Sequence, residues 1–129
     1  MSFREALDKH LRAIQERDLR SLAETLPAVD LILIMSDGRL VRTTREFLEL
    51  HRGWFEQTGW SLDAQVVSTR ETADMALAVL RLDYHDVRPD GLRVRELSHL
   101  TLAFARQDGR WVMVHDQNTP IKNPDAASA

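Results

Sequence analysis

The stretch from Leu97 to Thr119, LSHLTLAFARQDGRWVMVHDQNT, decides the fold. Two runs rich in apolar residues flank Asp108-Gly109, a pair that favours a tight turn between antiparallel strands. The stretch also carries His99 and His115, two of the five histidines. It therefore predicts a long terminal hairpin and indicates where a pocket should lie.

Upstream of this hairpin, three segments combine an N-cap residue with apolar residues at helical spacing. The predicted caps are Ser2, Asp18 and Thr43, and Ser2 and Thr43 are each followed by a glutamate three residues later. The expected helices run from about Phe3 to Arg17, from Leu19 to Leu26 and from Thr44 to Thr58. Gly59 is expected to end the third helix as its C-cap residue.

The other segments favour strands. The expected strands are Val29–Met35, Arg39–Arg42, Trp60–Ser68, Met75–Asp86, Leu92–Arg106 and Arg110–Asn118. The order α-α-β-β-α-β-β-β-β predicts an α+β fold in which a curved, largely antiparallel sheet wraps around three helices in the N-terminal half. Residues 1–120 are expected to form one domain and residues 121–129 a loose C-terminal tail.

The long strand that starts at Met75 is apolar on both of its faces. Leu77 and Val79 lie on one parity, and Ala78 and Leu80 on the other. A sheet buried on one face alone would alternate more cleanly between apolar and polar residues. We therefore expect the second face to be covered by a second copy of the chain in a twofold homodimer.

Composition excludes several classes of protein. The net charge of −3 argues against a nucleic-acid partner, which a basic patch would normally signal. The absence of cysteine excludes disulfides, thiolate catalysis and cysteine-ligated metals. No apolar run approaches the ~20 residues of a membrane span, and the N-terminus has no apolar signal-peptide core. We expect a soluble cytoplasmic protein without a membrane partner.

The element order and the run from Asp108 to Asp116, DGRWVMVHD, resemble the nuclear transport factor 2-like superfamily. They are most similar to small bacterial SnoaL-like and association-domain-like proteins, whose last strand follows the pattern D-G-x-W-x-[IV]-V-H-x-H-x-S. This chain departs from the pattern at Gln117, in place of the second histidine, and at Thr119, in place of the serine.

The resemblance implies a cystatin-like cone with a pocket between the sheet and the helices. Proteins of this superfamily include ketosteroid isomerase, scytalone dehydratase, limonene-epoxide hydrolase, polyketide cyclases and non-enzymatic assembly domains. Because one fold hosts all of these, function must be argued from the site.

Two residues are candidates for acid–base catalysis. In a regular last strand, His115 shares a face with Trp111, and we assign that face to the pocket because a tryptophan needs a core. His115 could then act as an acid or base near pH 7; the alternative is a hydrogen-bonded core histidine. Asp30 precedes an apolar run, and burial would raise its pKa and make it a second candidate base.

Six further residues are expected at the pocket: Trp54, Tyr84, His99, Gln117, His51 and His10. Trp54 suits a small hydrophobic or planar organic ligand, although core packing is the favoured explanation of this residue. A phenol such as Tyr84 could donate to an oxyanion. His10 and His51 lie on apolar helix faces, but no H-x-x-x-H or H-E-x-x-H pair supports a metal. We expect no metal and no cofactor.

These observations leave two functions open. In the first, the protein binds a small organic molecule in an apolar pocket. Any reaction would then be cofactor-independent acid–base chemistry of the isomerase, cyclase or dehydratase type. In the second, it is a non-catalytic dimerisation or assembly module whose pocket is vestigial.

Overall fold

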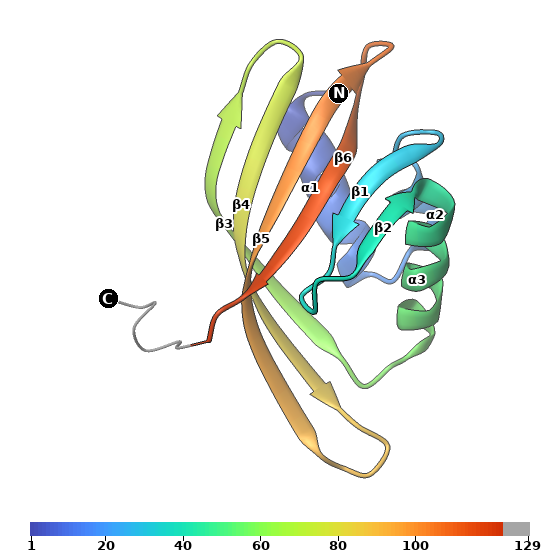
Figure 1. Cartoon of the computed structure of the whole chain (residues 1–129), viewed down its shortest axis with the longest axis vertical. Helices are drawn as coiled ribbons and strands as arrows, with labels where there is room; N and C mark the ends of the chain where they lie inside the picture. Colours follow the sequence, from blue (N-terminus) through green and yellow to red (C-terminus); the bar gives the residue numbers. More distant parts are fainter. Residues whose placement is uncertain (123–129) are drawn as a thin grey trace.

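The computed structural model describes residues 1–122. Three helices, α1 (Phe3–Gln15), α2 (Leu19–Ala23) and α3 (Thr44–Glu56), lie in the first half of the chain. The strands are β1 (Asp30–Ile34), β2 (Leu40–Thr43), β3 (Ser61–Glu71), β4 (Met75–Val87), β5 (Arg93–Gln107) and β6 (Arg110–Pro120). Their order confirms the prediction, and the fold is α+β with a cystatin-like architecture (Figure 1).

Local side-chain chemistry starts each helix where the sequence predicts it. Ser2 Oγ accepts a hydrogen bond from the backbone N–H of Glu5, 3.1 Å away, and the Glu5 carboxylate accepts one from the N–H of Ser2. The side chains of Asp18 and Thr43 cap α2 and α3 by accepting from the backbone N–H groups of Ser21 and Glu46. These bonds satisfy backbone donors that have no partner inside the helix.

The predicted C-cap role of Gly59 is wrong. The helix α3 ends at Glu56, and the residue after it, Gln57, is already extended. Gly59 is needed for a different reason, because a Cβ atom there would lie 2.8 Å from the carbonyl oxygen of Val87. The close approach joins the segment after α3 to the end of β4, where the N–H of Val87 donates to the carbonyl of Gly59.

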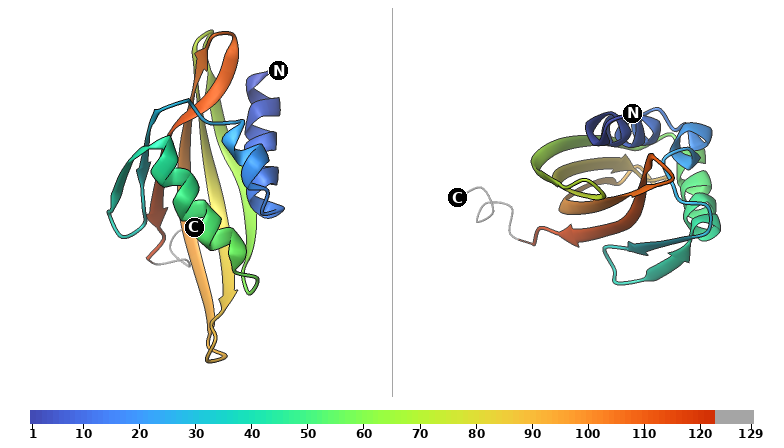
Figure 2. Two further views of the ribbon diagram at one scale, coloured as in Figure 1. Left: turned by 90° about the vertical axis from the view of Figure 1, so that its right-hand side faces the viewer. Right: turned by 90° about the horizontal axis from the view of Figure 1, so that it is seen from above.

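The six strands form one sheet in the order β2-β1-β6-β5-β4-β3. Among these described strands, the β1–β6 pair is parallel and the other four pairs are antiparallel. The sheet curves strongly, and the helices lie on one side of it (Figure 2). We call this side the inner face. Helix α1 packs against β3 and β6, whereas α3 packs against β1 and β2. The core between them includes Leu7, Phe47, Leu80, Leu102 and Phe104, all fully buried.

An irregularity in β6 changes which side chains face the core. Ala103 of β5 pairs with His115, but the next residue, Phe104, pairs with Met113. Val114 is therefore an extra residue, as in a β-bulge, and it inverts the alternation of the strand. Before the bulge Met113 is buried on the inner face, and after it Asp116 takes that orientation.

The outer face of the sheet carries no helix from residues 1–122 (Figure 2). Two of its apolar side chains, Met75 and Leu77 of β4, are 48% and 40% exposed. The strand β6 ends at Pro120, close to the predicted domain boundary, and most of the predicted tail (123–129) lies outside the described residues. No helix in the described part of the chain is long and apolar enough to cross a membrane.

Candidate functional site

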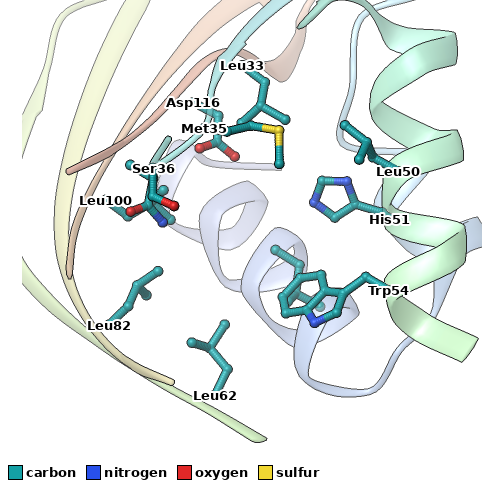
Figure 3. Close-up of a pocket in the computed structure, with 12 residues that line it drawn as sticks. Leu33, Met35, Ser36, Leu50, His51, Trp54, Leu62, Leu82, Leu100 and Asp116 are labelled. Carbon is teal, nitrogen blue, oxygen red and sulfur yellow. The ribbon is translucent and has the colours of Figure 1, made fainter. Parts of the chain in front are cut away.

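A cavity of about 240 Å³ lies between α1, α3 and the inner face of the sheet (Figure 3). We call it the inner chamber. Its wall is mostly apolar and includes Ile14, Leu50 and Trp54 from the helices and Leu33, Leu82 and Leu100 from the sheet. Four polar residues also line it: Ser36, His51, Asp116 and Asn118. An apolar wall with a few polar groups is typical of a small-molecule site.

Asp116 is the most unusual of these polar residues. Its side chain is buried, with 6% of its surface exposed, and it makes no hydrogen bond to any other described residue. No lysine or arginine lines the chamber to compensate its charge. Burial raises the pKa of Asp116 to about 7, far above the usual value near 4. Both of its protonation states are therefore populated at neutral pH, as proton transfer requires.

His51 lies across the chamber from Asp116, on α3 (Figure 3). Its Nδ1 donates a hydrogen bond to the carbonyl oxygen of Phe47, 2.7 Å away, and its ring stacks on that of Phe47. A carbonyl can only accept, so the proton resides on Nδ1 and the lone pair on Nε2. Burial lowers the pKa of His51 to about 4, which keeps the ring neutral at physiological pH.

Asn118 adds a second unpartnered acceptor to the sheet wall. It follows Asp116 by two residues on β6, so both side chains point inward beyond the bulge. Asn118 Oδ1 is fully buried and has no hydrogen-bond partner among the described residues. The sheet wall of the chamber therefore presents a carboxyl group and an amide next to each other.

The inner chamber continues into a larger cavity of about 720 Å³, which we call the vestibule. The two share Met35, Ser36, Trp54, Leu62, Leu82 and Asn118. The vestibule extends along the β4–β5 hairpin to Tyr84 and Glu96. The Tyr84 hydroxyl donates to Asp86 Oδ2, 3.0 Å away, so its oxygen can still accept a hydrogen bond. A ligand in the inner chamber can thus extend outward between Trp54 and the sheet.

The structure brings three of the predicted site residues to this cavity. Trp54 and His51 line the inner chamber, and Tyr84 lines the vestibule. His10 does not line it, because the ring is fully buried between α1 and the sheet. His10 Nδ1 donates to Thr25 Oγ1, 2.7 Å away, whose own hydroxyl donates to a backbone carbonyl. The pocket position predicted for His10 is therefore wrong.

The predicted positions of both catalytic candidates are also wrong. The bulge at Val114 turns His115 to the outer face, where it hydrogen-bonds to Gln117 at 3.1 Å. Gln117 and His99 are exposed on that face too. Asp30 is exposed at the start of β1, so it lacks the burial on which its proposed role depended.

The histidines consequently do not converge. His10 and His51 lie on the helical side, whereas His115 lies beyond the sheet. Within residues 1–122, no three histidine or acidic side chains are grouped as metal ligands would be.

Sequence reasoning missed Asp116, Asn118 and Ser36. One signal for the first two was available: Trp111 to Val114 reads WVMV, which is apolar at both parities and so breaks the alternation of a one-sided strand. Such a run is compatible with a change of face within the strand. Ser36 lies in the β1–β2 turn, and its position depends on how that turn folds over the cavity.

This chain is a nuclear transport factor 2-like domain, because its strongly curved sheet packs against three helices and leaves an apolar chamber between them. Within that class, the model of the SnoaL-like domain family matches residues 4–120, and the chain belongs to this family. Among proteins of curated function, none matches the sequence.

Solved structures agree with this assignment of the fold. A candidate calcium/calmodulin-dependent protein kinase type II association domain from Thiobacillus denitrificans superimposes with a TM-score of 0.78 at 16% identity, covering 94% of this chain and 96% of that one. A candidate dehydratase of the NTF2-like family from Streptomyces avermitilis gives 0.76 at 16% identity, covering 92% and 93%. An uncharacterised cystatin-like protein from Caulobacter vibrioides gives 0.76 at 25% identity, covering 97% and 90%.

Proposed function

We propose that this protein binds a small apolar organic molecule in the inner chamber and that Asp116 transfers a proton to or from it. The observation that carries the proposal is a buried carboxyl group, on the wall of an apolar cavity, that has no hydrogen-bond partner among residues 1–122. Burying such a group destabilises the fold unless it is paired, so its presence there favours a chemical role.

The chemistry that suits this arrangement is acid–base catalysis of the isomerase, cyclase or dehydratase type. Asp116 can give or take a proton near neutral pH, and His51 offers a neutral lone pair from the opposite wall. Asn118 is placed to orient a polar group of the substrate beside the carboxyl group. In this proposal Asp116, His51 and Asn118 supply all the groups that transfer the proton and orient the substrate.

A direct test follows the exchange of the acidic C–H protons of a probe ketone, 2-tetralone, in D₂O by NMR. We expect the wild-type protein to accelerate the exchange and Asp116→Asn to lose that acceleration by about 10²-fold or more, the usual effect of removing a general base. His115→Ala, on the outer face, is the matched control and should retain it. Full activity in Asp116→Asn, or loss in His115→Ala, would contradict the proposal.

A second candidate function is assembly, and the exposed apolar side chains of the outer face favour it. Met75 and Leu77 of β4 stand on the same face as the small side chains Ala103 and Ala105 of β5. A second copy of the chain would remove these surfaces from water. The two functions use opposite faces of the sheet, so one molecule can perform both.

A further inference from the structure

We infer that the molecule held in the inner chamber carries a hydroxyl group, as an apolar alcohol or phenol does, and that this hydroxyl binds between Asp116, Asn118 and His51. The inference rests on the proposed binding function and specifies the chemistry of its ligand.

The first argument is the inventory of unused hydrogen-bonding atoms. Asn118 Oδ1 is buried without a donor, and His51 Nε2 has only a lone pair to offer because Nδ1 already donates to Phe47. Buried acceptors are normally paired, and leaving them unpaired is costly. Both acceptors would therefore be satisfied by a ligand that brings a hydrogen-bond donor, which the described part of the chain does not supply.

The second argument is that Asp116, unlike Asn118 Oδ1 and His51 Nε2, needs a hydrogen-bond acceptor as its partner. In its protonated form Asp116 is a donor, and no acceptor among residues 1–122 is bonded to it. A hydroxyl group can accept from Asp116 while it donates to Asn118 or to His51. A ketone such as 2-tetralone can accept from Asp116 and so can serve as a probe, but it leaves both acceptors unpaired.

The third argument is charge. No lysine or arginine lines the inner chamber, so a carboxylate or phosphate would be buried without a counter-charge and next to Asp116. An ammonium group could pair with the Asp116 carboxylate, but its desolvation in an apolar wall would be compensated only while Asp116 is ionised. A neutral hydroxyl avoids both costs.

The cavity also limits the shape of the rest of the molecule. Trp54 lines both the inner chamber and the vestibule, and its ring stacks on Trp60 with centroids 4.1 Å apart. This rigid aromatic wall favours a flat hydrophobic body that enters with its hydroxyl end first. The outer end of that body would lie near Tyr84 in the vestibule.

The test compares probes of one shape at pH 6.5 by NMR titration of the ¹⁵N-labelled protein. The probes are 2-naphthol, 2-methylnaphthalene, 2-naphthoate and 2-naphthylmethylammonium. We expect 2-naphthol to bind at least ~10-fold more tightly than 2-methylnaphthalene, the scale of one net hydrogen bond. We expect the two charged probes to bind more weakly than 2-naphthol, and the shifts to map to the inner chamber.

Two variants identify the groups responsible. Asn118→Leu removes an acceptor at similar volume, and His51→Phe removes the lone pair while it keeps the aromatic stack on Phe47. Each should reduce the ratio of naphthol to methylnaphthalene affinity several-fold. His99→Leu, on the outer face, should leave that ratio unchanged.

Equal affinity for 2-naphthol and 2-methylnaphthalene would overturn the hydroxyl inference and leave the proposed binding function intact. Tighter binding of the carboxylate or the ammonium probe would overturn it as well. If none of the four probes binds the inner chamber, the proposed function fails together with the inference.

Discussion

At the scale of single residues, Asp116 makes the stability of the fold depend on pH. Its pKa is raised to about 7 in the folded protein, whereas an unfolded aspartate titrates near 4. The folded state therefore holds an extra proton between these values. The contribution of protonated Asp116 to the free energy of unfolding is fully present below pH ~4 and is lost as the pH rises to about 7. Above pH 7 the buried charge lowers the free energy of unfolding by a constant amount.

The first prediction concerns Asp116→Asn, which removes that charge at nearly the same volume. We expect the variant to unfold several degrees higher than the wild type at pH 8, because a buried ionised carboxyl no longer has to be accommodated. The difference should be much smaller at pH 4. Differential scanning calorimetry at the two pH values measures it. An equal change at both would show that Asp116 does not titrate as its burial implies.

The second prediction concerns the two buried histidines, whose effect has the opposite sign. Burial lowers the pKa of His10 to about 3 and that of His51 to about 4, so each stabilises the fold above pH ~6.5 and loses that contribution as the pH falls. Near pH 5 the unfolded state binds about two more protons than the folded state at the two histidines and about one fewer at Asp116. Unfolding therefore takes up about one proton in total. Together the three groups make the free energy of unfolding increase with rising pH by about 1.4 kcal/mol per pH unit near pH 5.

His51→Phe removes one of these titrations and keeps the stack on Phe47. We expect the contribution of the remaining groups, Asp116 and His10, to nearly cancel near pH 5, so that the slope falls by about 1.4 kcal/mol per pH unit. Urea unfolding at pH 4.5, 5.0 and 5.5 gives the slope. His99→Phe, which changes an exposed histidine on the outer face, is the control and should preserve it.

At the scale of elements, the bulge in β6 determines the site. The sequence predicted the strands, the caps and the contribution of His51 and Trp54, because helix and strand periodicities are local properties. It did not predict the face of Asp116, because one unpaired residue at Val114 inverts every position after it. That bulge depends on how β6 pairs with the curved β5, which is a non-local property.

The third prediction follows from this register. Deleting Val114 would pair Met113 with Phe104 and His115 with Ala103 in regular succession, so Asp116 would still face the inner chamber. We expect the ¹³C titration of the Asp116 carboxyl to remain near pH 7 in the deletion variant. A titration near pH 4 would mean that the carboxyl group has turned to solvent and that the bulge itself is required.

The fourth prediction compares Gly53, inside α3, with Gly59, in the connection between α3 and β3. Gly59→Ala would place a Cβ 2.8 Å from the carbonyl oxygen of Val87, so the contact between the α3–β3 segment and β4 must shift. We expect a loss of about 1–3 kcal/mol in the free energy of unfolding, the range for overpacking. Gly53→Ala meets no atom within 4 Å and lies inside α3, so it should instead gain up to about 1 kcal/mol. Urea unfolding of both variants measures these opposite signs.

At the scale of the whole molecule, the curved sheet separates two surfaces with different properties. The inner face encloses the chamber with Asp116, and the outer face presents His99, His115 and Gln117 beside apolar side chains. In the long strands, consecutive apolar residues alternate between the inner and the outer face, so both faces carry apolar side chains, as the sequence pattern indicated. Because β4 to β6 contribute to each surface, binding in the chamber and assembly through the outer face are compatible in one fold.

The fifth prediction tests assembly through the outer face. Leu77 is 40% exposed on that face, near the start of β4 and opposite Ala103 of β5, so Leu77→Asp would place a charge in an interface formed there. We expect the wild type to have the mass of a dimer in light scattering after size exclusion, and Leu77→Asp that of a monomer. Leu92→Asp changes a similarly exposed leucine at the tip of the β4–β5 hairpin and should remain dimeric. If Leu77→Asp keeps the wild-type mass while ligand binding persists, the outer face does not mediate assembly, and the inner chamber alone carries the function.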